Sequence, residues 1–329
     1  TDIFSRVLKM EADRMKHLLL DEGSVEKERS VIFEERKYRY ENSPRGKLYL
    51  NMMQYVFEGT PYGGSVIGEV DDLKALSAKT LKDFHSQFYV PNNATLVVVG
   101  DVEASEVFDL SEKFFGPLKK SPDLKKKKAK LDRKNVYKDN NLKNKWIKVH
   151  GTSRVPLFMM AFNGEALGER EGFVMDLVAS LLGQGESSHF YQKFVKSNRP
   201  SLSQIYAANY TLMHNGVFFF GGELLGQQSL NSFRKKMIQE VATACEAINE
   251  RNLRKAKNQI IVDFYGSIKT NAGLASFIGD REFSYNDYSF YKKELEIYES
   301  VTVKEAKKAC RKTLDDHVFL SLWNKHPQN

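Results

Sequence analysis

Residues 76–100, "LSAKTLKDFHSQFYVPNNATLVVVG", hold the pattern that decides the fold. Ser77 can cap a helix of about three turns, and after a polar break the run "ATLVVVG" (residues 94–100) has the apolar, β-branched character of a buried strand. The same order recurs in residues 301–324, "VTVKEAKKACRKTLDDHVFLSLWN", where Thr302 takes the place of the cap. A capped helix followed by an apolar strand, present twice, indicates an internal repeat.

The two copies are offset by 225 residues, from Ser77 to Thr302. The second copy extends from about Trp146 and has 156 residues before Thr302, whereas only 76 residues precede Ser77. The first copy is therefore shorter by about 80 residues, and we expect it to lack its opening strands and helix. The chain also begins at Thr1, without an initiator Met, which predicts a natural N-terminus further upstream.

Helical and strand patterns alternate along the chain. The apolar runs "VPLFMMAF" (155–162), "SQIYAANY" (203–210) and "GVFFFGGEL" (216–224) predict strands, the last two as an antiparallel hairpin, and amphipathic stretches predict helices between them. The fold class is thus α/β (α+β), with two related domains, each a mixed β-sheet backed by helices. Residues 1–118 form the first domain, 119–145 a basic linker and 146–329 the second domain.

The positive charge of the chain is concentrated in that linker. The net charge is +8, yet residues 119–148 alone contain thirteen Lys or Arg and three Asp. The segment has few large apolar residues, so it reads as a solvated connection between domains. An acidic partner or nucleic acid is the alternative, but only Tyr137 and Trp146 could stack on bases, and we expect no nucleic-acid binding.

Two further classes are disfavoured by composition. The longest apolar runs are far shorter than the roughly 20 residues that span a bilayer, so no membrane span is predicted. Cys245 and Cys310 are 65 residues apart and form no CxxC motif. This spacing predicts neither a disulfide nor a thiolate metal site.

Two carboxylates stand out in residues 25–44, "VEKERSVIFEERKYRYENSP". At the helical period, Glu28 and Glu35 share a face with Val31 and Ile32, so they interrupt a stripe that would otherwise be apolar. A carboxylate on an inward face needs a cation, a hydrogen-bond donor or a metal, because burying it without a partner costs several kcal/mol.

The repeat offset shows that these acids belong to one copy only. It aligns Glu28 with Leu253 and Glu35 with Ile260, the apolar residues that a core-facing stripe requires. On their own, two glutamates on a charged helix are more often solvated or salt-bridged than ligands.

The runs "EADRMKHLLLDEGSVEKERSVIFEERKYRYENSPRG" (11–46), "TPYGGSVIGEVDDLKALSAKTLKDFHSQFYVPNNATLVVVGDV" (60–102) and "LLGQGESSHFYQKF" (181–194) resemble the M16 family of zinc peptidases, the pitrilysin and insulinase group. The resemblance covers nearly the whole chain. It implies a clamshell that encloses a peptide or unfolded protein substrate, metal-assisted peptide hydrolysis, and a homodimer or a paired M16 subunit. It leaves the compartment unknown, with a periplasmic leaning from bacterial members.

The family's zinc site combines an HxxEH motif with a glutamate in the pattern ExxxxxxE, which the spacing of Glu28 and Glu35 matches. The resemblance implies Glu35 as the third zinc ligand and Glu28 as a supporting catalytic-site acid that orients a ligating histidine. Two imidazoles and one carboxylate leave zinc an open position for water. We therefore expect Zn²⁺ as cofactor of the intact protein.

The chain departs from the family pattern in its histidines. It has seven, and no pair has HxxEH or HExxH spacing: His17, His85, His150, His189, His214, His317 and His326. The expectation is that this chain alone neither holds zinc tightly nor cleaves peptides. His189 and Gln204 stand near positions where many members carry a substrate-binding Arg and Tyr, so no substrate contact is assigned to them. The alternative function is a non-catalytic M16 scaffold that assembles with an active partner.

Overall fold

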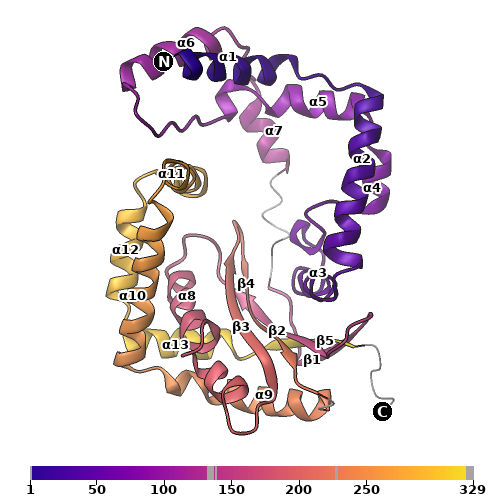
Figure 1. Ribbon diagram of the computed structural model, residues 1–329, viewed down its shortest axis with the longest axis vertical. Helices are drawn as coiled ribbons and strands as arrows, with labels where there is room; N and C mark the ends of the chain where they lie inside the picture. The colour runs from indigo at the N-terminus through magenta and orange to yellow at the C-terminus, as the bar shows by residue number, and fades with distance from the viewer. Residues whose placement is uncertain (1, 132–136, 138, 227–228, 324–329) are drawn as a thin grey trace. The chain divides into compact units, whose positions relative to one another are not determined.

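The computed structural model describes residues 2–131, 137, 139–226 and 229–323 (Figure 1). The chain divides into two compact units that are each assembled from distant segments. The first comprises Thr1–Glu35, Ile67–Arg133 and Tyr265–Ser289, and the second comprises Arg36–Val66, Lys134–Phe264 and Phe290–Asn329. The linear boundaries expected after residues 118 and 145 stay a prediction.

The second unit is built on one mixed five-stranded sheet. Its strands are β1 (Lys145–His150), β2 (Leu157–Gly164), β3 (Leu202–Thr211), β4 (Gly216–Leu224) and β5 (His317–Trp323). The order is β1-β5-β2-β4-β3, in which β1 and β5 are parallel and the other pairs antiparallel. The mixed α/β class is confirmed, and so is the predicted β3–β4 hairpin.

Helices account for most of the remaining structure. Those of the first unit are α1 (Asp2–His17), α2 (Glu22–Arg36), α4 (Val70–Ala75), α5 (Ala78–Phe88), α6 (Ala104–Phe115), α7 (Leu124–Leu131) and α11 (Asn271–Tyr285). Those of the second are α3 (Pro44–Val56), α8 (Arg170–Gly183), α9 (Leu230–Ala244), α10 (Glu250–Ser267, of which the residues from Tyr265 on are counted with the first unit), α12 (Tyr291–Ser300) and α13 (Val303–Thr313). No helix in the described ranges is both long and apolar enough to cross a membrane.

The sheet is buried on both faces, which explains why its strands read as continuous apolar runs. On one face, Leu48 and Met52 of α3 pack with Met159 and Leu320 of the sheet. On the other face the core is aromatic: Phe158 of β2 stacks on Phe319 at a centroid distance of 5.7 Å. Helices α8, α9 and α13 belong to this second unit, and Figure 1 shows α3 and the sheet beside one another.

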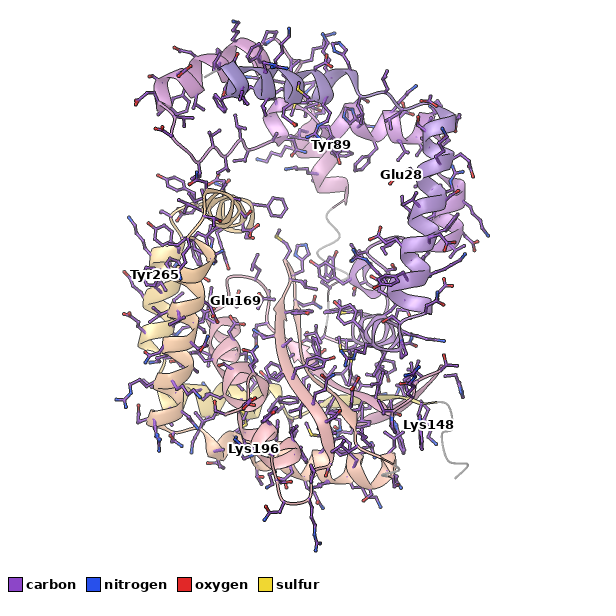
Figure 2. All side chains as sticks on the ribbon, in the orientation of Figure 1. Glu28, Tyr89, Lys148, Glu169, Lys196 and Tyr265 are labelled. Carbon is purple, nitrogen blue, oxygen red and sulfur yellow. A yellow bond between two sulfur atoms is a disulfide. The ribbon has the colours of Figure 1, made fainter. Side chains whose placement is uncertain are left out.

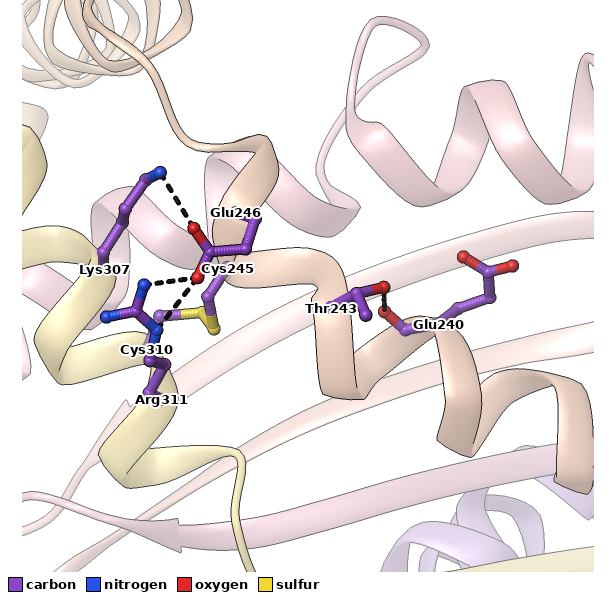
Figure 3. Close-up of a disulfide and its surroundings, with 7 residues drawn as sticks. All are labelled: Glu240, Thr243, Cys245, Glu246, Lys307, Cys310 and Arg311. Carbon is purple, nitrogen blue, oxygen red and sulfur yellow. Dashed lines mark hydrogen bonds and ion pairs between the residues drawn. A yellow bond between two sulfur atoms is a disulfide. The ribbon is translucent and has the colours of Figure 1, made fainter.

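The cysteine prediction is wrong, because Cys245 and Cys310 form a disulfide with Cα atoms 5.8 Å apart (Figure 3). Cys245 follows α9 directly, in the 3₁₀ turn Cys245–Ala247, and Cys310 lies on the buried face of α13. Both segments pack against each other in the second unit. A spacing of 65 residues carries no local signal of such a pairing, so the sequence could not reveal it.

The strand predicted at residues 94–100 is not formed. Ser77 does cap α5, its Oγ accepting a hydrogen bond from the backbone N–H of Thr80 at 3.2 Å, as expected. The apolar run after α5, however, pairs with no described segment. A strand exists only through its neighbours, so an apolar run cannot by itself make one.

The basic linker is more ordered than expected. Helix α7 lies within it, and Leu142 is fully buried with its N–H donating to Asp316 Oδ2 at 2.9 Å. The linker residues 132–136 and 138 lie outside the described residues. The interpretation of residues 119–145 as a solvated connection between domains stays a prediction.

Gly46 permits a close approach between α3 and the preceding turn. A Cβ at this position would lie 1.7 Å from the carbonyl oxygen of Arg39. We expect Gly46→Ala to lower the free energy of unfolding by about 2 kcal/mol, because overpacking forces the backbone to shift. Gly266→Ala is the matched control, since a Cβ there meets no atom within 4 Å. Urea unfolding measures both, and equal midpoints for the two variants would contradict the prediction.

Candidate functional site

Helix α2 carries both glutamates that the sequence singled out, two helical turns apart (Figure 2, where Glu28 is labelled). The helix begins after Asp21, whose carboxylate accepts hydrogen bonds from the backbone N–H of Ser24 at 2.9 Å and from its hydroxyl at 2.7 Å. These bonds satisfy a free donor of the first turn. They also hold the pKa of Asp21 below its usual value.

Long-range hydrogen bonds fix α2 against the connection between α4 and α5. Arg29 donates through Nε to the carbonyl of Leu73 at 3.1 Å and through Nη2 to that of Leu76 at 2.5 Å. Glu22 accepts a hydrogen bond from the first N–H of α5, that of Ala78, at 3.1 Å. Both carbonyls and the N–H are free groups at helix ends, so α2 is positioned by satisfying them.

The structure rotates the buried face of α2 away from the predicted one. Val25 and Arg36 are buried, at 7% and 8% exposure, and Arg29 is half-buried, whereas Glu28 and Glu35 are exposed. The expectation of an inward-facing carboxylate pair is therefore wrong for this chain. The physical reason is that Arg29 and Arg36, each one position after a glutamate, bury their aliphatic stems. Their guanidinium groups find carbonyl or carboxylate partners.

The roles predicted for the glutamates then rest on spacing and resemblance, not on burial. After Arg36, the last residue of α2, the helix widens into a π-helical turn, η1 (Lys37–Glu41), closed by the hydrogen bond from Asn42 N–H to the carbonyl of Lys37 at 2.8 Å. Arg36 spans this turn through an ion pair with Glu41 at 3.1 Å.

The described residues do not make a complete zinc site. Among them, no three His, Cys, Asp or Glu side chains are grouped closely enough to hold a metal ion. Zinc requires at least three protein ligands, so α2 can offer one carboxylate to a site but cannot form it.

A second candidate is a hollow of about 620 Å³ in the second unit. It lies between the end of α8, the following loop and α10, and its lining includes Gln184, Ser187, His189, Lys255 and Gln259. Burial and, to a lesser extent, the charge of Lys193 lower the pKa of His189, which favours the neutral imidazole, whereas the charge of Glu240 acts against this shift. The sequence analysis noted His189 only because it departs from the arginine common in the family. It could not predict the hollow, because α8 and α10 are distant in the chain.

Comparison with known proteins places this chain in a family. The model described as "Peptidase M16 inactive domain" matches residues 75–260. The chain is 28% identical over 283 residues to the zinc protease PqqE of Helicobacter pylori, covering 83% of this chain and 61% of that protein. It is 22% identical to the uncharacterized zinc protease YmxG of Bacillus subtilis, covering 82% and 63%.

A relative of another kind is subunit 1 of the mitochondrial cytochrome b-c1 complex of Caenorhabditis elegans, 22% identical over 95% of this chain and 66% of that protein. The chain thus spans less than two thirds of the length of these curated relatives. Among solved structures, a protease from Helicobacter pylori superposes with a TM-score of 0.84 at 25% identity, over 98% of this chain and 77% of that one.

The peptidase M16 inactive domain from Pseudomonas fluorescens gives the same TM-score of 0.84 at 18% identity, over 100% and 77%. That likeness shows the fold. With the match over residues 75–260, more than half of the sequence, it follows that the chain belongs to the peptidase M16 family.

Proposed function

We propose that this chain is the part of an M16 zinc peptidase that contributes Glu35 as the carboxylate ligand of zinc and Glu28 as an acid that orients a ligating histidine. The protein hydrolyses peptides or unfolded polypeptides. The observation that carries the proposal is the seven-residue spacing of the two glutamates on α2. Arg29, as a donor, and Glu22, as an acceptor, hold this helix by hydrogen bonds to the ends of α4 and α5. The names of the relatives, zinc proteases PqqE and YmxG, support it.

The exposure of both glutamates fits a ligand that is completed by other residues. A carboxylate that binds zinc together with two histidines must be accessible to that zinc ion, so neighbouring side chains of its own helix cannot cover it. The chain has no HxxEH motif, so the two histidines come from outside residues 1–329. Alone, residues 1–329 are expected to be inactive, and the domain boundaries 1–118, 119–145 and 146–329 belong to this proposal.

A second function is a non-catalytic scaffold that pairs with an active M16 subunit. It is favoured by the likeness to subunit 1 of the cytochrome b-c1 complex, which extends over 95% of this chain, and by the family description "inactive domain". Against it stands the retention of Glu28 and Glu35 where the internal repeat has Leu253 and Ile260.

The two functions are separated by Glu35→Gln in the natural full-length protein. We expect bound zinc to fall from about one equivalent to none, and hydrolysis of an unfolded casein substrate to be lost, because a neutral amide is a poor ligand for zinc. Bound zinc is measured by atomic emission after gel filtration. Glu34→Gln is the matched control, an exposed neighbour on the same helix that should keep zinc and activity.

Each outcome decides between the candidates. Unit zinc in Glu35→Gln would overturn the ligand assignment. Absence of zinc and of hydrolysis in the unmodified full-length protein would instead favour the scaffold. Circular dichroism and the unfolding midpoint of both variants show whether a loss of metal follows from a loss of structure.

A further inference from the structure

Another hollow of the second unit lies between two helices that a disulfide joins. It has a volume of about 480 Å³ and is lined by residues of α9, of the end of α13 and of strands β2 and β5. Cys245 also lines it, so the Cys245–Cys310 cross-link lies at its border. The volume is within the range of small-molecule sites in proteins, about 300–1,000 Å³.

One wall of this hollow is apolar. Met160 of β2 and Leu314 belong to it, and α9 contributes Ile238, Val241 and Ala242. The three residues of α9 are three and four positions apart, which puts them on one face of the helix. Ala242 is exposed, so solvent and small solutes reach this wall. An occupant that covers the wall therefore has an aliphatic part.

The hollow also contains a buried nitrogen that lacks a hydrogen bond. His317, the first residue of β5, lines the hollow and is 5% exposed, and its Nε2 has no hydrogen-bond partner among the described residues. Burial and then the charge of Arg234 lower the pKa of His317 to about 4, although the charge of Asp316 acts against this shift. The imidazole is thus neutral at pH 7. Its Nε2 can donate a hydrogen bond in one of the two tautomers.

A second unpaired nitrogen, Nε of Arg234, lies close to His317. Arg234 is four residues before Ile238 and therefore on the same face of α9. Its Nη2 donates to the carbonyl of Asn144 at 3.2 Å, and the backbone N–H of His317 donates to Oδ1 of Asn144 at 3.3 Å. Nε of Arg234 is buried without a hydrogen-bond partner among the described residues, although a guanidinium N–H can only donate.

Two unpaired donors require an acceptor, and the charge of Arg234 favours an anionic one. A hydrogen bond from a guanidinium to a carboxylate is stronger than one to a neutral oxygen. The other arginine at the hollow, Arg311, already donates to Glu246 at 3.0 Å. Of the nearby acids, Asp316 accepts two backbone N–H groups at 2.9 and 3.3 Å, and Asp315 is exposed, where solvent screens its charge.

We propose that this hollow binds a small aliphatic carboxylate. Its oxygens accept hydrogen bonds from Nε of Arg234 and Nε2 of His317, and its hydrocarbon chain lies against the apolar face of α9. Both nitrogens are then paired without a change of the fold, and the apolar wall is covered by the same molecule. The site contains no residue of α2, so this inference does not depend on a role of Glu28 or Glu35.

Isothermal titration calorimetry of the 329-residue chain tests the site, with hexanoate as the probe. We expect one hexanoate to bind, at least tenfold more tightly than 1-hexanol, which has the same chain without the charge. Hexylamine, with the opposite charge, should not bind. In a ¹H–¹⁵N spectrum the Nε–H signal of Arg234, assigned by its absence in Arg234→Lys, should shift when hexanoate is added.

A carboxylate of this kind has two sources, a free short-chain acid and the last residue of a peptide. N-Acetylleucine, which places its carboxylate and its branched chain on the same carbon, represents the peptide source. It is titrated beside hexanoate under the same conditions. Binding of either compound supports the site, and the tighter of the two identifies the source.

Variants separate the two parts of the site. Arg234→Lys keeps the charge without Nε–H, and His317→Phe keeps a ring without nitrogens. Each should weaken hexanoate about tenfold or more, because a hydrogen bond to a charged group is lost. Ala242→Phe fills the hollow from an exposed position and should abolish binding, whereas Gln239→Phe, exposed on the same helix but outside the lining, should not change it. Asp315→Asn removes a like charge and should tighten binding about two- to threefold.

Three results would overturn the inference. Hexanoate that binds no more tightly than 1-hexanol, or does not bind, would show that water alone satisfies the two nitrogens. Binding of hexylamine, or weaker binding of hexanoate to Asp315→Asn, would show that the site takes a cation. Equal affinities of Ala242→Phe and Gln239→Phe would place the ligand elsewhere, and their urea midpoints show that both variants are folded.

Discussion

We expect that breaking the Cys245–Cys310 disulfide lowers the free energy of unfolding of the second unit by about 4 kcal/mol. The cross-link closes a loop of 65 residues, and the chain-entropy model assigns that loop a penalty of this size in the unfolded ensemble. Because domains are stable by only about 5–15 kcal/mol, the loss removes a large part of the total.

The native contacts around the disulfide limit how much structure is lost with it. Figure 3 shows Glu246, next to Cys245, facing Lys307 and Arg311 of α13. Glu246 accepts from Nε of Arg311 at 3.0 Å and from Nζ of Lys307 at 3.1 Å, and the hydrogen bonds from Arg311, then those from Lys307, lower its pKa. These exposed pairs add little stability, but they keep α13 in register with the end of α9.

The measurement is urea unfolding of the wild type with and without a thiol reductant, and of the double variant Cys245→Ala/Cys310→Ala. The double variant should match the reduced wild type within about 1 kcal/mol and should not respond to reductant. Since the chain has only these two cysteines, no other thiol complicates the comparison. An unchanged midpoint after complete reduction would show that the two thiols stay positioned by packing alone.

The local part of the fold could be predicted from sequence. Thr302 caps α13, its hydroxyl oxygen accepting a hydrogen bond from the backbone N–H of Glu305, and Ala306, Ala309 and Cys310 form the buried face of the helix, as the period of the sequence requires. Strand β5 follows with the apolar run that predicted it. The cap and the helical period depend on residues that are close in sequence. The strand β5 could form because its pairing partners, β1 and β2, belong to the same chain.

The predictions that were wrong concern structure that depends on residues distant in the chain. Residues 94–100 have the same local pattern as β5, but no described segment pairs with them. The face of α2 was misjudged because Arg29 is held by the carbonyls of Leu73 and Leu76, which a periodicity argument cannot foresee. The zinc-site role of Glu28 and Glu35 stays a prediction from spacing and resemblance. The 620 Å³ hollow was missed because it lies between α8 and α10, which are distant in the chain.

Asp176 and His317 are expected to give opposing contributions to the pH dependence of stability. Burial raises the pKa of Asp176 to about 6, although hydrogen bonds from Asn209 at 2.9 Å and from the hydroxyl of Tyr298 at 2.7 Å act against this shift. Burial, with the nearby charge of Arg234, lowers the pKa of His317 to about 4. The unperturbed values are 3.8 and 6.5, so both groups change the stability in the same pH range.

The signs are opposite. Between about pH 4 and 6 the folded protein keeps the proton of Asp176 and the unfolded chain has lost it, so stability falls as pH rises, by about 3 kcal/mol at 1.36 kcal/mol per pKa unit. Between about pH 4 and 6.5 the unfolded chain protonates His317 and the folded protein does not, so stability rises with pH. In the wild type the two contributions largely cancel.

Asp176→Asn should therefore reveal the contribution of His317. The amide can accept from Asn209 and donate to the hydroxyl of Tyr298, so the packing is kept while the titration is removed. We expect the variant to be more stable than the wild type by about 2–3 kcal/mol at pH 7, and to lose stability steeply as the pH falls from 6.5 to 4. Urea unfolding at half-unit steps of pH measures both.

His317→Asn provides the converse test, because it removes the contribution that rises with pH. Its stability should decrease between pH 4 and 6, where the wild type is nearly flat, and the double variant with Asp176→Asn should be nearly flat again. A wild type and two single variants that share one pH profile would contradict the assignment. Such a result would mean that water reaches both groups in the folded protein and keeps their pKa values near those of the unfolded chain.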